Sequence, residues 1–198
     1  TGRQIWKTNL SQDGQTEYSP VVYKGKVFMG YSGPAPEVFC LDADTGAIRW
    51  RWRINREGPE KSGTGGGSLW TSGAIDEQQN VVFNVTGSNS AYAPAGPMLY
   101  TNSLVAQDAD TGELLWAYQA HPQDAHDLDF CAHPMVFDAI SPPRFRGDVR
   151  RCVAAANKAN MICLNRHTGE LYWKVSVNAF AAGTGGPKLD AAAVAYNT

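Results

Sequence analysis

Charge is scarce in this sequence, and the patterns that mark several protein classes are missing from it. Lys plus Arg number 17 and Asp plus Glu number 19, so that 18% of the 198 residues are charged and the formal net charge is −2. A soluble domain usually carries about 25% charged residues. Because the charges are so nearly balanced, the sequence lacks the excess of positive charge that nucleic-acid binding requires. No apolar run approaches the roughly 18 residues of a transmembrane helix, so no transmembrane segment is expected.

Cysteine motifs are also absent. The chain has 4 cysteines but no C-x-x-C pair, which argues against a zinc cluster, and no C-x-x-C-H, which argues against a c-type haem. Apolar residues nevertheless make up 43% of the chain, enough for a packed core, and this excludes global disorder. The chain begins with Thr1 and shows no signal peptide, so that we expect a processed chain or a fragment of a longer one.

One motif, [DN]-x-x-T-G-x-x-x-W, recurs along the chain. It lies in VFCLDADTGAIRW at 38–50, LVAQDADTGELLW at 104–116 and MICLNRHTGELYW at 161–173. The opening TGRQIW, which ends at Trp6, matches the tail of the same unit. A repeat of this size with a Trp at a fixed place is typical of β-propeller blades. We therefore expect the four repeat tryptophans to pack between neighbouring blades.

Each unit is predicted to form four short strands joined by tight turns, and no long amphipathic helix is visible. The fold class is therefore all-β, a partial β-propeller of about three to three and a half four-stranded blades in a single domain, 1–198. The expected boundaries are a blade tail at 1–8, blades at about 17–54, 70–119 and 133–176, and a loop or the start of another blade at 177–198. Because a closed propeller needs at least four blades, we expect further blades of a longer polypeptide, or another chain, to close the ring.

The cysteines lead to one structural prediction. Cys131 lies just before HPMVFD and Cys152 lies in RRCVAA, so that a hairpin around 139–149 would bring them face to face. The expected Cys131–Cys152 disulfide would indicate an oxidising compartment. Cys40 and Cys163 share one repeat position and are expected to be free core thiols.

A further set of motifs appears in order along the chain. These are GGGSLW at 65–70, AID at 74–76, VTG at 85–87, YTNSLVAQDADTG at 100–112, PQDAHDLD at 122–129 and NKAN at 157–160. Together they resemble the pyrroloquinoline quinone (PQQ)-dependent alcohol dehydrogenases, from about residue 1 to 175. The resemblance implies an eight-bladed propeller with PQQ in a funnel on its axis, of which this chain would supply about three blades.

The same resemblance implies roles for five residues in holding PQQ. Trp70 would lie flat under the quinone rings, where a planar ring needs a planar apolar floor. Gly67, in the run of three glycines, would let the backbone approach closely. Ser68 would hydrogen-bond the cofactor edge and Ser32 a cofactor carboxylate. Lys158 would donate to the quinone oxygens and stabilise the negative charge that develops on reduction.

The resemblance further implies that Asp127 is the general base, which takes the alcohol proton while hydride passes to PQQ. Candidate ligands for a metal ion at this site are Asp127, Asp129, Asn89, Ser88 and Glu37. The implied ion is Ca²⁺, which prefers carboxylate and other oxygen ligands. A lanthanide is the alternative, because relatives that use lanthanides carry an extra Asp at the place of Asp129.

The chain departs from the family pattern around this metal. The family Glu is replaced by Ala35, two residues before Glu37, and the family T-G-N pattern becomes T-G-S at Ser88. His126 stands where the family commonly has Trp, and no two cysteines are adjacent. An open alternative is therefore that these blades have lost their metal.

Each site residue also has a purely structural interpretation. Trp70 would be another inter-blade Trp, Asp127 and Asp129 solvated loop carboxylates, and Lys158 a surface lysine. The function that the motifs favour is a periplasmic or secreted PQQ-dependent dehydrogenase that oxidises an alcohol and passes electrons to a separate acceptor such as a cytochrome. The alternative is a non-catalytic quinoprotein-like propeller that serves as a binding or assembly module.

Overall fold

The computed structural model of the chain is built from β-strands alone over the residues it describes, which are 1–10, 14–33, 35–54, 66–88, 99–122, 124, 126–140 and 148–176. The strands are β1 (Val21–Tyr23), β2 (Lys26–Tyr31), β3 (Glu37–Asp42), β4 (Ile48–Arg53), β5 (Ala74–Asp76), β6 (Val81–Val85), β7 (Ser103–Asp108), β8 (Leu114–Gln119), β9 (Met135–Ile140), β10 (Val149–Ala156), β11 (Asn160–Asn165) and β12 (Leu171–Ser176). Within these residues, no helix is long and apolar enough to cross a membrane.

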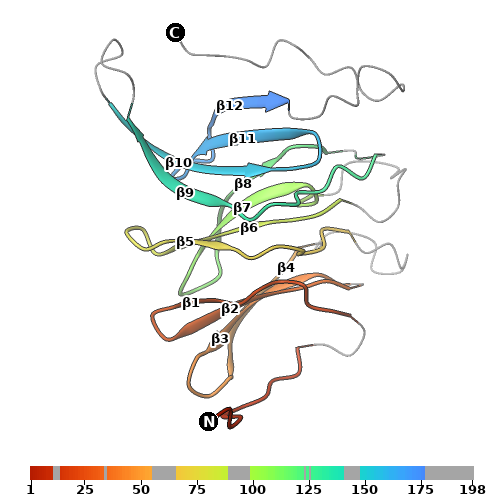
Figure 1. Cartoon of the computed structure of the whole chain (residues 1–198), viewed down its shortest axis with the longest axis vertical. Helices are drawn as coiled ribbons and strands as arrows, with labels where there is room; N and C mark the ends of the chain where they lie inside the picture. The colour runs from red at the N-terminus through yellow and green to blue at the C-terminus, as the bar shows by residue number, and fades with distance from the viewer. Residues whose placement is uncertain are drawn as a thin grey trace.

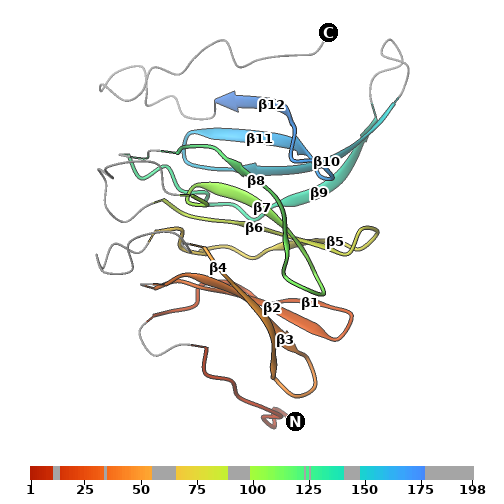
Figure 2. The same ribbon diagram turned by 180° about the vertical axis from the view of Figure 1, so that it is seen from behind.

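The strands form three sheets of four, each made of strands that follow one another in the chain. Every neighbouring pair is antiparallel, and the sheets β1–β4, β5–β8 and β9–β12 lie face to face in a stack (Figures 1 and 2). This arrangement confirms the all-β class and a partial propeller of three four-stranded blades. The single-domain boundaries stay a prediction, and 177–198 lie outside the described residues.

Three of the four repeat tryptophans join neighbouring units, as the motif predicts, whereas Trp173 lies on the last described sheet, where the prediction is not tested. Each indole Nε1 donates to a backbone carbonyl in the Asp-x-x-Thr-Gly type turn of the next unit: Trp6 to Ala43 at 2.9 Å, Trp50 to Ala109 at 3.2 Å and Trp116 to Arg166 at 3.2 Å. The turn glycines have positive φ, and a Cβ on any of them would lie 2.5 to 2.7 Å from the Trp ring: Gly46, Gly112 and Gly169. Glycine is therefore required there for both backbone conformation and contact.

Apolar side chains fill the two spaces between the sheets. The first cluster joins β1–β4 to β5–β8 and includes Phe28, Val38, Cys40, Trp50, Val82 and Val105. The second joins β5–β8 to β9–β12 and includes Phe83, Leu104, Val153, Ile162 and Leu164. Because each sheet buries residues on both faces, the strands read as nearly continuous apolar runs, such as VVFNV in β6.

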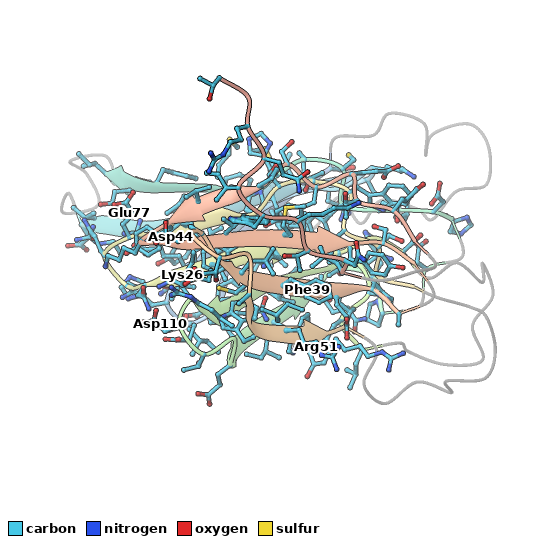
Figure 3. The ribbon with its side chains drawn as sticks, turned by 90° about the horizontal axis from the view of Figure 1, so that it is seen from below. Lys26, Phe39, Asp44, Arg51, Glu77 and Asp110 are labelled. Carbon is cyan, nitrogen blue, oxygen red and sulfur yellow. The ribbon has the colours of Figure 1, made fainter. Side chains whose placement is uncertain are left out.

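Charged contacts link the sheets at the end that carries the Asp-x-x-Thr-Gly turns. Lys26, buried at the start of β2, forms an ion pair with Asp110 in the β7–β8 turn at 2.5 Å. Figure 3 shows Lys26 and Asp110 at this end of the sheets, with Asp44 and Glu77 also placed there. The site loops described below lie at the opposite end.

The expected Cys131–Cys152 disulfide is not formed, and the prediction was wrong about register. Both cysteines are free thiols. The Cys131 N–H donates to Ala156 O at 3.2 Å, four residues along β10 from Cys152, whose partners are Phe137 and Asn165. The disulfide therefore lends no support to an oxidising compartment.

Cys40 and Cys163 are buried free thiols, as their shared repeat position predicts. Burial raises the pKa of the Cys40 thiol to about 11 and that of Cys163 to about 12. Since the thiolate is the reactive form, these cysteines are packing residues of the core.

Candidate active site

The candidate site lies at one end of the stacked sheets. Because neighbouring strands alternate in direction, the connections β2–β3, β4–β5, β6–β7, β8–β9 and β10–β11 all share this end (Figure 1). Propeller folds place functional residues on such loops, which the rigid sheets hold in place.

A lysine bridges two carboxylates at this end. Lys158 Nζ lies 2.7 Å from Asp127 Oδ2 and 2.9 Å from Asp129 Oδ2. Asp129 is buried, whereas the side chains of Asp127 and Lys158 are 45% and 41% exposed. The group therefore joins the β8–β9 and β10–β11 connections and leaves one carboxylate open to solvent.

Ser88, from the β6–β7 connection, completes this group. Its backbone N–H donates to Asp129 Oδ1, and its hydroxyl donates to Asp127 Oδ1 at 3.3 Å. Four residues that the motif order singles out are thus in direct contact, although they come from three separate connections.

Hydrogen bonding and burial oppose each other at this group. Burial by itself would raise the pKa of Asp129, but the hydrogen bonds from Ser88 and Lys158 outweigh it, so that the pKa falls below the usual value. Burial would likewise lower the pKa of Lys158, and its bonds to Asp127 and Asp129 outweigh this and raise it. The lysine is therefore a cation and Asp129 an anion at neutral pH.

Trp70 lies directly beside the charged group. Two backbone hydrogen bonds pair its segment with the one that carries Ser88: Gly67 N to Ser88 O at 2.9 Å and Gly87 N to Ser68 O at 2.7 Å. A Cβ on Gly87 would lie 2.5 Å from Trp70 Nε1 and 3.0 Å from Asp129 Oδ1. Trp70 is 40% exposed although it is a large aromatic residue, so it offers apolar aromatic surface next to the carboxylates.

Gly67 has a φ of +84°, and a Cβ there would lie 2.6 Å from Ile54 Cγ2. Only glycine fits both requirements. The close approach of Gly67 to a cofactor stays a prediction. Ser68 is partly buried and lies between Gly67 and Leu69 in the same segment.

Ser32 holds the backbone of the segment that carries Trp70. Its hydroxyl oxygen accepts from Leu69 N at 2.9 Å and its hydroxyl donates to Leu69 O at 3.3 Å. Ser32 is buried at the end of β2, and both bonds go to the residue next to Trp70. The serine therefore anchors the backbone next to the aromatic surface, and its role toward a cofactor carboxylate stays a prediction.

Of the remaining metal-ligand candidates, only Glu37 is among the described residues, and it does not contact the group. Glu37 begins β3 opposite Arg53, and no contact in the described part of the chain links it to Asp127, Asp129 or Ser88. Asn89 lies outside the described residues. Among the residues that are described, no cluster of three or more His, Cys, Asp or Glu side chains is placed to hold a metal ion.

Three residues at this end have a left-handed backbone, which is uncommon outside glycine. They are Tyr100, Asn102 and Asp127, with φ of +67°, +47° and +59°. Such conformations persist only where surrounding contacts enforce them, and they gather at functional sites. Lys24 and Asn80, in turns at the opposite end, have a left-handed backbone as well, so this feature alone does not mark the loop as functional.

Two residues of the site were given no role by sequence reasoning. Asp124 and Asn102 are buried beneath the Asp127 loop and hydrogen-bond each other at 3.0 Å. Both lie inside the motifs that carry the family resemblance. The usable signal is D-x-x-D at 124–127, because an Asp side chain readily accepts from backbone N–H groups that follow it.

Comparison with known proteins supports the interpretation of the fold and of the family resemblance. The family model for the PQQ glucose/ethanol/alcohol dehydrogenase β-propeller domain matches residues 8–188. The chain is 31% identical over 193 residues to the quinohemoprotein alcohol dehydrogenase of Comamonas testosteroni, a match that covers 80% of this chain and 27% of the relative. It is 31% identical over 228 residues to quinohemoprotein alcohol dehydrogenase ADH IIB of Pseudomonas putida, covering 97% of this chain and 32% of the relative.

Among solved structures, quinohemoprotein alcohol dehydrogenase ADHIIG of Pseudomonas putida HK5 superposes with a TM-score of 0.78 at 28% identity. That match covers 89% of this chain and 30% of the other. The chain thus spans about a third, or less, of the length of the curated relatives it matches.

Proposed function

Because the chain belongs to the β-propeller family of PQQ-dependent alcohol dehydrogenases, we propose that it is part of an enzyme that oxidises an alcohol with PQQ. The observation that carries this proposal is the contact of Asp127, Asp129 and Lys158 beside the exposed face of Trp70. It combines a carboxylate open to solvent, a fixed cation and a flat aromatic surface. These are the groups that proton removal and the binding of a planar quinone require.

In the proposed reaction, Asp127 accepts the hydroxyl proton of the alcohol. Lys158 and Ser88 both contact its carboxylate and hold it in one orientation. PQQ, when bound, supplies the hydride acceptor. Trp70 provides a flat surface for the quinone rings. Ser68 hydrogen-bonds the edge of the cofactor, and Ser32 holds either the backbone next to Trp70 or a cofactor carboxylate. Gly67 lets the backbone approach the cofactor closely. Lys158 provides positive charge where negative charge develops.

A metal ion is the second proposed ligand, either Ca²⁺ or a lanthanide. Lys158 Nζ lies within 3 Å of both Asp127 and Asp129, so the two carboxylates already converge on one cation position. Carboxylate oxygens are the donors that Ca²⁺ prefers, and they fit such an ion in charge and chemistry. Ser88, Asn89 and Glu37 are the further candidate ligands from this chain. The ion and the Lys158 ammonium would compete for the position between the carboxylates.

This competition predicts that Lys158→Met raises the affinity for a lanthanide. Removing the ammonium removes a repulsion of roughly 1–4 kcal/mol between like charges a few ångströms apart, so that terbium should bind at least about tenfold more tightly. Terbium luminescence, excited through the nearby Trp70 indole, measures the binding. Lys24→Met, in the β1–β2 turn, is the matched control and should leave the affinity unchanged. An unchanged affinity in Lys158→Met would contradict the shared cation position.

The proposed function is tested with the full-length protein, loaded with PQQ and either Ca²⁺ or lanthanum. We expect dye-linked oxidation of primary alcohols that requires added PQQ, and we expect Trp70→Ala to lose PQQ retention on gel filtration. Retention of wild-type PQQ binding by Trp70→Ala would remove Trp70 from the site. Absence of turnover under every loading would instead favour a binding or assembly module, an alternative that the changed residues Ala35 and Ser88 motivate.

We also propose that the enzyme works in the periplasm or as a secreted protein and delivers electrons to a separate acceptor such as a cytochrome. The quinohemoprotein names of the matched relatives support an electron path through haem. The motif C-x-x-C-H is absent from these 198 residues, so the haem would belong to another part or partner.

A further inference from the structure

Asp124 is a buried carboxylate held by neutral donors. It is 4% exposed, and it accepts from Asn102 Nδ2 at 3.0 Å, His126 N at 2.8 Å and Leu128 N at 2.6 Å. Removing a charged group from water is costly, and three hydrogen bonds to the ionised form offset that cost. A buried carboxylate is uncommon in a surface loop, because an exposed Asp side chain can accept the same backbone hydrogen bonds of a turn without losing its contact with water.

The two backbone hydrogen bonds to Asp124 come from the residues on either side of Asp127. The amides of His126 and Leu128 lie just before and just after it, and the Leu128 N–H belongs to the peptide that follows Asp127. Asp127 itself has a φ of +59°. This conformation raises the free energy of an Asp residue, so it persists only where neighbouring contacts enforce it. The carboxylate of Asp124 supplies those contacts, and it thereby directs the Asp127 side chain toward Lys158.

Asn102 ties this loop to the rest of the site. It is fully buried, its backbone N–H donates to Gly87 O at 2.8 Å, and its carbonyl accepts from Ala120 N at 2.8 Å. Gly87 is the residue in contact with both Trp70 and Asp129. Through Asn102, the backbone beneath the aromatic surface and the Asp127 loop are therefore held at one fixed spacing.

We propose that Asp124 and Asn102 are positioning residues, which act through Asp127 by fixing its backbone and its distance from the Trp70 surface. This inference rests on the proposed function, in which Asp127 removes the alcohol proton. A misplacement of the base by about 1 Å is enough to slow a proton transfer by up to about 100-fold. The pair thus affects the rate of the reaction more than the binding of its substrate.

The test uses Asp124→Asn in the full-length holoenzyme. The amide offers one acceptor oxygen where the carboxylate has two, and its NH2 group would face an N–H donor, so at least one of the three bonds from Asn102, His126 and Leu128 would be lost. We expect kcat to fall by about 10- to 100-fold and KM for the alcohol and the PQQ content to stay within about twofold. A second variant, Asn102→Gly, keeps the positive φ without strain and removes only the bond between the loops, leaving both backbone bonds to Asp124, so kcat should fall by less than in Asp124→Asn.

A second readout is independent of activity. Hydrogen exchange of the segment 120–134, followed by mass spectrometry, should be faster in Asp124→Asn and, to a smaller extent, in Asn102→Gly. The matched control is Asp108→Asn, since Asp108 also caps a turn by accepting from Asp110 N and Thr111 N, but at the opposite end of the sheets. It should change neither kcat nor exchange of 120–134.

Wild-type kcat in Asp124→Asn, or a larger loss of kcat in Asn102→Gly than in Asp124→Asn, would overturn the proposal. A parallel loss of kcat and Tm in both variants would also overturn it, because the role would then be structural. If the wild-type protein oxidises no alcohol, the proposed function fails by itself. Exchange that is unaltered in Asp124→Asn overturns the positioning role in that case too.

Discussion

Replacing Asp127 by Asn is expected to lower kcat for alcohol oxidation by about 10²–10⁴-fold, the usual loss when a general base is removed. The amide has the shape of the carboxylate but offers no basic oxygen to hold the alcohol proton. Lys158 would keep its second carboxylate partner, Asp129, at 2.9 Å, so the charge of the lysine stays compensated. Because the Asp127 side chain is 45% exposed, we expect the fold to tolerate the change.

The measurement is dye-linked alcohol oxidation by full-length protein loaded with PQQ and metal, accompanied by thermal unfolding. Asp44→Asn is the matched control, since Asp44 lies in the exposed β3–β4 turn at the opposite end of the sheets. We expect the control to match the wild-type rate and both variants to keep the wild-type Tm. Turnover by Asp127→Asn within threefold of wild type would exclude Asp127 as the base.

The fold was predictable because its signal is local and repeated. Each T-G-x-x-x-W segment contains the turn glycine, the strand and the Trp that contacts the next unit, and these elements lie within a few residues of one another. The structure confirms this at Trp6, Trp50 and Trp116, whose indoles all bind the next turn. Repetition then supplies the stacking of the blades, because the same contact recurs from sheet to sheet.

The site was predictable only through the order of its motifs. Asp127, Asp129, Lys158 and Ser88 are far apart in the sequence, and no spacing rule joins a D-x-D to a distant lysine. The family resemblance grouped them, and the structure brings these four residues into contact. Glu37 was grouped with them in the same way, but no contact in the described part of the chain links it to the other four.

The strand register at the cysteines and the burial of Arg166 could not be predicted from the sequence. The Cys131–Cys152 prediction assumed that the hairpin strands begin at the cysteines, whereas β9 begins at Met135 and carries Cys131 past the end of the pairing. Arg166 occupies a repeat position that holds Ala43 and Ala109 in the other units, and nothing in the motif marks it as buried. Its partners lie on two other strands, so only the packed structure reveals the contact.

Arg166 forms a buried charge network between the second and third sheets. Its Nε lies 2.6 Å from Asp76 Oδ2 at the end of β5, and these side chains are only 5% and 3% exposed. Its Nη1 also lies 2.7 Å from Asp138 Oδ1 on β9 and donates to Phe137 O at 3.2 Å. Asp138 is in addition paired with Arg151. Asp76 therefore depends on Arg166 for its charge compensation more than Asp138 does.

Arg166→Met is accordingly expected to lower the free energy of unfolding by about 3–5 kcal/mol, since it leaves the Asp76 carboxylate buried without its cation. Urea unfolding of the full-length protein measures the loss. Arg151→Met removes the more exposed arginine of the same network and should cost about 1 kcal/mol or less. Adding Asp76→Asn to Arg166→Met removes the stranded charge and should restore at least half of the loss. If the double variant were no more stable than Arg166→Met, the cost would come from lost packing of the arginine stem, and the charge argument would fail.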